Sequence, residues 1–170
     1  MRRWLPTREL VAVCDNTSST LDWLDAVRHE VWIITRLPLD AVLYQPASAQ
    51  KPKQNGRPPQ QEARLPTLVR AVVDPTIPWK LTTVEQWYRQ GKHPVQITSA
   101  TAVWYHSGLP PVPIRWVLVR DPEGKLAPEA LLSTNLALAP LRILTWFVQR
   151  WQLLGVARVR GIALTSPVDA

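Results

Sequence analysis

The stretch RELVAVCDNTSSTLDWLDAVRHEVWIIT, residues 8–35, decides the fold class. It opens with a continuous apolar run that ends at Asp15, which is typical of a strand buried on both faces. Residues of the types that cap helices follow at 16–19, and 20–29 then carries apolar side chains at helical spacing. A second apolar run, Val31–Thr35, predicts another strand. Strand, helix and strand within about 30 residues predict a βαβ unit.

Composition indicates one globular domain. The chain has 170 residues, 46% of them hydrophobic and 19% charged, so it is long enough to bury a core and is not wholly disordered. Its single cysteine, Cys14, excludes an internal disulfide and a cysteine-rich metal site, and its apolar surroundings predict a buried, inert thiol. No signal core and no run of about 18 apolar residues is present, so we expect a soluble cytoplasmic protein with no membrane partner.

The charge balance favours a polyanionic partner. Twenty basic residues against 13 acidic ones give a net charge of +7, with a pI near 10.2. Nucleic acid is the first candidate for such a partner. A basic protein whose surface is simply well solvated is the alternative.

The middle of the chain, residues 38–138, has a different texture. Segment 46–66 is polar, rich in proline and basic, which predicts a mobile loop. In it, Lys51, Lys53 and Arg57 are candidate contacts to a DNA backbone, although a solvated loop is the alternative. The rest, 67–138, is predicted to be rich in β-structure, with a turn at 121–124. The expected strands are Trp79–Val84, Val95–Tyr105, Ile114–Arg120 and Ala130–Thr134.

A helix is predicted over 139–154. Pro140 suits the first turn, and LRILTWFVQRWQLL, residues 141–154, has the pattern of an amphipathic helix. Phe147, Arg150 and Leu154 are three and four residues apart and therefore share one face. Arg150 on a core helix could also extend its charge to solvent. Beyond this segment, 155–170 shows no periodicity and is predicted to be an irregular tail.

The pattern Phe147-x2-Arg150-x3-Leu154 resembles the Tyr-x2-Arg-x3-Glu-x6-Lys signature of bacterial insertion-sequence transposases of the DDE type. Leu154 stands at the place of the glutamate, and Gly161 at that of the lysine. Over residues 8–154 the order of elements is similar to the RNase H-like catalytic domain of that family. The fold implied is α/β, a partial RNase H-like fold. It would comprise a strand-helix-strand core at 1–37, an insertion at 38–138 and a core helix at 139–154.

The resemblance also implies a chemistry. In that family three carboxylates hold two Mg²⁺ ions, which activate water or a DNA 3′-hydroxyl for attack on a phosphodiester. Asp15 corresponds to the second catalytic Asp and metal ligand, and Arg150 to the signature Arg. The first Asp belongs to a strand upstream of this chain, and Leu154 replaces the Glu. On residues alone, Asp15 could instead assist the cap of the next helix.

The sequence-based hypothesis is therefore a truncated DDE transposase that does not transpose DNA by itself. The implied partners are the DNA ends of a mobile element and an intact transposase. In related transposases a tryptophan of the insertion stacks on a base, but we interpret Trp79, Trp87, Trp104 and Trp116 as packing residues. Two alternatives stay open. One is a non-catalytic DNA-binding protein that interferes with transposition, and the other is a β-rich module that binds protein.

Overall fold

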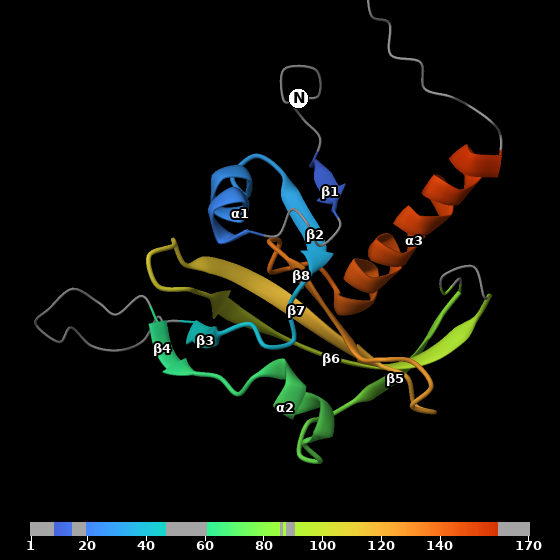
Figure 1. The fold of residues 1–170 in the computed structure, drawn as a ribbon, viewed down its shortest axis with the longest axis horizontal. Coiled ribbons are helices and arrows are strands. Elements are labelled where there is room, and N and C mark those ends of the chain that lie inside the picture. Colours follow the sequence, from blue (N-terminus) through green and yellow to red (C-terminus); the bar gives the residue numbers. More distant parts are fainter. Residues whose placement is uncertain (1–8, 15–19, 47–60, 86, 88–90, 160–170) are drawn as a thin grey trace, which may run out of the picture.

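The computed structural model describes residues 9–14, 20–46, 61–85, 87 and 91–159. In these residues one mixed sheet forms the centre of the molecule, with helices on both faces (Figure 1). The strand order is β1-β2-β8-β7-β6-β3-β4, and β5 pairs with β6 beside this path. The expected α/β class is confirmed, with strands predominating over helices.

The predicted βαβ unit is present at the start of the chain. Strand β1 (Val11–Val13), helix α1 (Leu21–Val27) and strand β2 (Trp32–Arg36) follow one another. The two strands are parallel, with Val11 opposite Trp32. Residues of β2 alternate between the two faces of the sheet, and both faces are covered, so consecutive apolar residues can all be buried.

The middle of the chain completes the same sheet. Strands β6 (His93–Trp104), β7 (Val112–Arg120) and β8 (Glu129–Ser133) form an antiparallel meander. β8 then pairs antiparallel with β2. Strand β5 (Lys80–Val84) pairs with the start of β6. The four strands expected in 67–138 are therefore present, and their backbone pairing is continuous with that of the βαβ unit.

Three short elements were not predicted from the sequence. Strands β3 (Leu43–Pro46) and β4 (Gln61–Arg64) form an antiparallel pair, and helix α2 (Leu68–Val73) follows them. The prediction of a loop over 46–66 is wrong at both ends, because β3 includes Pro46 and β4 lies inside that range. Tertiary pairing explains the difference, since β3 is held by the end of β6 rather than by an apolar pattern of its own.

Helix α3 spans Pro140–Val159 and begins where the sequence predicts. It is longer than expected, so the prediction of an irregular tail from residue 155 is wrong for 155–159. A single glycine such as Gly155 costs an established helix only about 1 kcal/mol, which does not stop propagation. The remainder of the predicted tail, 160–170, lies outside the described residues.

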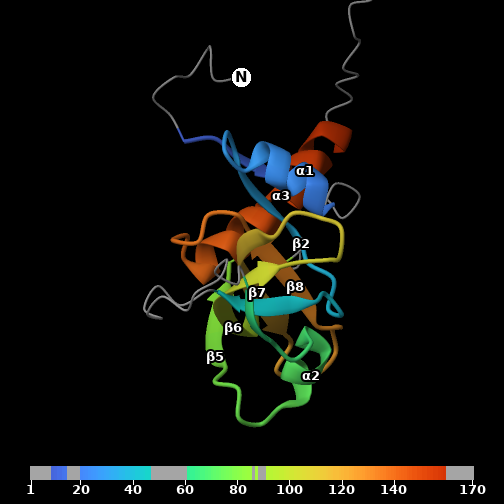
Figure 2. The ribbon, with the colours of Figure 1, turned by 90° about the vertical axis from the view of Figure 1, so that its left-hand side faces the viewer.

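Two clusters of buried side chains lie on opposite faces of the sheet. The first cluster, on the side of α1 and α2, includes Leu24, Ile33 and Leu132. The second cluster, on the side of α3, includes Ile34, Val117 and Phe147. Figure 1 shows α1 and α3 on either side of β1 and β2, and Figure 2 shows α2 at the far end of the molecule from α1.

One edge of the sheet is formed by β1. Among the described residues this strand pairs only with β2, so no described strand pairs with its second edge. In the described part of the chain, no helix is both long enough and apolar enough to cross a membrane.

Candidate nucleic-acid and metal site

The C-terminal end of β1 is the place where the sequence predicts a metal ligand. The Cys14 N–H donates a hydrogen bond to the Ile34 carbonyl oxygen at 2.8 Å, so pairing with β2 extends one residue beyond β1. Asp15, the predicted catalytic residue and metal ligand, follows directly in the sequence but lies outside the described residues. Its predicted roles are therefore not tested.

The face of α3 that carries the signature residues packs onto the sheet. Phe147 is fully buried in the second cluster. The Arg150 guanidinium lies over its ring, with Cζ 5.3 Å from the centroid, and the Arg36 guanidinium lies 5.7 Å from the same centroid. Both distances fall within the range of cation–π attraction. One buried aromatic ring therefore holds two arginines near it, one from the helix and one from β2.

Arg150 also acts on the end of β1. Burial raises the pKa of the Cys14 thiol, and the positive charge of Arg150 acts in the opposite direction. Helix α3, which carries Arg150, packs on β1, the strand that Cys14 follows. Cys14 is half-buried, so the expectation of a buried thiol is only partly met.

Arg36 was not predicted as a site residue. It ends β2, and its Nη2 lies 3.3 Å from Oε1 of Glu129 at the start of β8. Both side chains are about one-third exposed, at 34% and 32%. A lone arginine at the end of an apolar strand gives no sequence signal of this role, because the partner is 93 residues away in the chain.

The basic loop joins two strands that are paired. Pro46 and Gln61 lie opposite each other, so both ends of the segment leave the sheet at the same place. Lys51, Lys53 and Arg57, the predicted backbone contacts, lie outside the described residues. Their part in nucleic-acid binding stays a prediction.

The four tryptophans of the middle segment contribute to packing, as expected. Trp87 and Trp116 are buried, with exposed fractions of 6% and 9%. Trp79 and Trp104 are partly buried against the first cluster. The Arg120 guanidinium lies 3.9 Å from the Trp79 ring centroid, so one face of that ring is covered.

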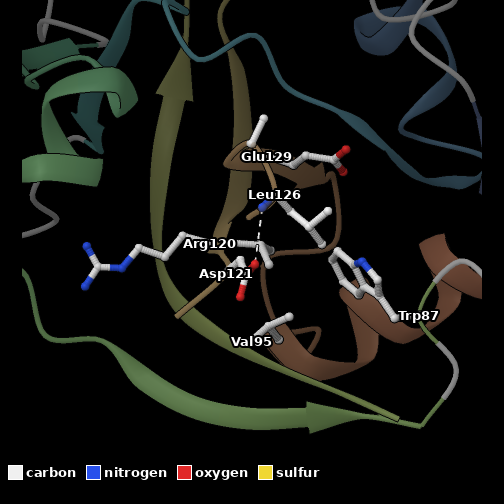
Figure 3. A pocket seen from close by; sticks show the side chains of 8 residues that line it. Trp87, Val95, Arg120, Asp121, Leu126 and Glu129 are labelled. Carbon is white, nitrogen blue, oxygen red and sulfur yellow. Dashed lines mark hydrogen bonds between the residues drawn. The ribbon is translucent and has the colours of Figure 1, made fainter. Parts of the chain in front are cut away.

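A small pocket lies between the end of β7 and the start of β8 (Figure 3). Trp87 and Leu126 face each other across it, while Arg120 points away. Its cavity of about 10 Å³ has room for roughly one water molecule, which is far too small for an organic ligand. The pocket is therefore a packing defect beside the β7–β8 turn and not a substrate site.

Asp121 organises that turn from a buried position. Its Oδ1 accepts the Glu123 N–H at 3.0 Å, and Oδ2 accepts the N–H groups of Lys125 and Leu126 at 3.0 and 3.2 Å. His93 Nε2 lies 3.9 Å from Oδ1. The Glu123 hydrogen bond lowers the pKa of the Asp121 carboxyl below its ordinary value, although burial opposes it, and the other contacts lower it further.

This lowered pKa gives a testable pH dependence. A carboxyl whose pKa is lower in the folded state stabilises the fold above its unfolded value of about 3.9, and this contribution is lost as the pH falls through the folded pKa. We expect Asp121→Asn to be less stable than the wild type near neutral pH. The difference should shrink progressively below about pH 4. Urea unfolding of both proteins from neutral pH to below about pH 4 measures this difference in stability. A stability difference that does not change with pH would contradict the prediction.

Among the described residues no group of three or more His, Cys, Asp or Glu side chains could hold a metal ion. Binding of the Mg²⁺ that the sequence resemblance implies would therefore require Asp15, which lies outside the described residues. The chain matches no protein-family model and no curated protein. The α3 face, the end of β1 and the basic loop are consequently interpreted from their own chemistry.

Proposed function

We propose that this chain is a derivative of a DDE-type transposase that binds DNA and does not cleave it by itself. The observation that carries the proposal is the position of Arg150. It lies on the face of α3 that packs on the sheet, with its guanidinium over the ring of the buried Phe147. An arginine side chain suits the binding of a phosphodiester, because it forms charge-assisted hydrogen bonds to phosphate oxygens.

Two further features support the proposal. The parallel pair of β1 and β2 is joined through α1, so the end of β1 lies at the carboxyl edge of parallel strands, where ligand sites of α/β sheets form. The net charge of +7 supplies the attraction for a polyanion. Neither feature alone distinguishes DNA from another polyanion, so the proposal rests on their combination with Arg150.

Loss of catalysis follows from the residue at position 154. Two Mg²⁺ ions need several carboxylates to hold them in fixed geometry, and leucine offers no ligand atom. Asp15 remains as a carboxylate that could hold one hard cation. Binding without cleavage is the outcome expected from that donor set.

A cleavage assay tests this expectation. Purified protein is incubated with supercoiled plasmid and Mg²⁺, and nicked product is measured over time for the wild type and for Asp15→Asn. We expect no nicking above background from either protein. Nicking that requires Mg²⁺ and disappears in Asp15→Asn would show that the chain is an active nuclease and would refute the proposed loss of catalysis.

The basic loop gives a second prediction. Replacing Lys51, Lys53 and Arg57 together with glutamine should weaken duplex DNA binding and flatten its salt dependence. If all three contact phosphates, the slope of log affinity against log salt should fall by about 2–3. Fluorescence anisotropy at several salt concentrations measures it, and an unchanged slope would exclude the loop from the interface.

A further inference from the structure

A second surface of the sheet extends from β7 across β6 and β3 to β4, the strand at the edge opposite β1. The pairing register of the strands determines which residues lie on this surface. Tyr44 on β3 lies opposite Arg64 on β4 and Val103 on β6, and Arg115 on β7 lies opposite Thr101 on β6. Directly opposed residues project from the same face of a sheet. We call this surface, made of Tyr44, Arg64, Thr101, Tyr105 and Arg115, the tyrosine–arginine face.

Strand alternation places this surface on the side of the second cluster. Val95 and Ile97 of β6 belong to that cluster, so Thr101 and Val103, which follow at even spacing, project the same way. Leu43, next to Tyr44, belongs to the first cluster and projects the other way. Helix α3 packs on β1, β2, β6, β7 and β8. Figure 1 shows α3 on the right and β3 on the left.

The rings of this face are accessible. Tyr44 and Tyr105 are half-buried and meet edge to face, with centroids 6.0 Å apart and planes at 70°. An edge-to-face pair leaves part of each ring surface free for a further aromatic group. Tyrosine combines a large apolar area with a polar hydroxyl, and few rotatable bonds are lost when it contacts a partner.

The face carries two arginines. Arg64 is exposed, and Arg115 is half-buried with an Nε that is fully buried and forms no hydrogen bond. Within the described residues, no carboxylate forms an ion pair with either guanidinium. The positive charge of the two guanidinium groups would attract an anion, which could accept charge-assisted hydrogen bonds from them. Cations and aromatic rings alternating on one sheet face match the phosphates and bases of an unpaired strand.

We infer that the tyrosine–arginine face binds single-stranded nucleic acid, with bases stacked on Tyr44 and Tyr105 and phosphates held by Arg64 and Arg115. The inference deepens the proposed function and rests on it, because it names the form of nucleic acid and the surface that takes it. The segment containing Lys51, Lys53 and Arg57 connects β3 to β4, so it departs from this same end of the sheet.

The test separates stacking from charge. The purified 170-residue chain is titrated, by fluorescence anisotropy, into labelled oligo(dT) of about 16 nucleotides and into an abasic strand of equal length and charge. We expect the wild type to bind oligo(dT) about tenfold or more tightly than the abasic strand, because only the former has bases to stack. The double variant Tyr44→Leu, Tyr105→Leu should lose this preference. The double variant Tyr44→Phe, Tyr105→Phe should keep the preference for oligo(dT), and it serves as the control for folding.

The arginines are tested through salt dependence. Arg64→Gln and Arg115→Gln should each lower the salt slope for oligo(dT) by about 0.7, the value for one phosphate contact with a single strand. Lys92→Gln is the matched control, because Lys92 is 73% exposed and pairs with Glu85 at the turn between β5 and β6. It should leave the slope unchanged. Equal falls in all three variants would overturn the assignment of phosphate contacts to this face.

The remaining outcomes are distinct. Equal affinity for oligo(dT) and the abasic strand, with duplex DNA still bound, overturns this inference and leaves the proposed function standing. Absence of binding to any nucleic acid overturns both. Tighter binding of oligo(U) than of oligo(dT), with the same dependence on the two tyrosines, supports the face and identifies RNA as the strand.

Discussion

Phe147→Ala is expected to destabilise the fold by about 3–5 kcal/mol, the largest effect of any substitution considered for this protein. Phe147 is the only phenylalanine in the chain and is fully buried between α3 and the sheet. Alanine would leave a cavity there and would also remove the ring that Arg36 and Arg150 contact. Unfolding in urea, followed by circular dichroism, measures the change.

Leu141→Ala is the matched control for this prediction. Leu141 lies on the same helix, but 43% of it is exposed, so its truncation should change stability by no more than about 0.5 kcal/mol. If Phe147→Ala cost as little as Leu141→Ala, α3 would not be packed on the sheet in solution. The position of Arg150 over the Phe147 ring would then lose its structural basis.

Thr134→Val is expected to cost about 1–3 kcal/mol although it preserves the size of the side chain. The Thr134 Oγ1 accepts the Ile33 N–H at 2.9 Å, and the Thr134 N–H donates to the Ile33 carbonyl oxygen at 3.0 Å. These bonds extend the pairing of β8 with β2, and Thr134 is buried. Valine would leave the buried Ile33 N–H without an acceptor, whereas the gain of a methyl group offsets only part of that cost.

Thr134→Ser separates the hydroxyl from the methyl group. Serine keeps the acceptor and should therefore retain more stability than valine at this site. Thermal or urea unfolding of the two variants gives the comparison directly. A valine variant as stable as the wild type would mean that the Ile33 N–H finds another acceptor, and that the join between the middle segment and the βαβ unit does not depend on Thr134.

Local pattern accounts for the elements that could be predicted from the sequence. Two apolar runs around an amphipathic segment suffice for β1, α1 and β2, and strand-like segments with a turn signal at 121–124 suffice for β6, β7 and β8. Strands β3 and β4 have no such pattern. Strand β3 forms because it pairs with the end of β6, about 60 positions away in the chain, and β4 forms because it pairs with β3.

In the candidate sites, too, local pattern predicts some residues, whereas others come together only through pairing between distant strands. Helical spacing was enough to place Phe147 and Arg150 on one face of α3. Arg36 and Glu129 could not be linked in advance, because only the pairing of β2 with β8 brings them together. The tyrosine–arginine face was missed for the same reason, since its five residues come from four separate segments of the chain and acquire a common face only through strand register.

The measurement that tests the central claim most directly is the affinity of the purified chain for DNA as a function of salt, with Mg²⁺ and with EDTA. DNA binding that weakens steeply with salt and is the same in both conditions is the predicted result, because cationic side chains and not a metal cluster would hold the phosphates. No binding at moderate salt would contradict the account and would favour a module that binds protein.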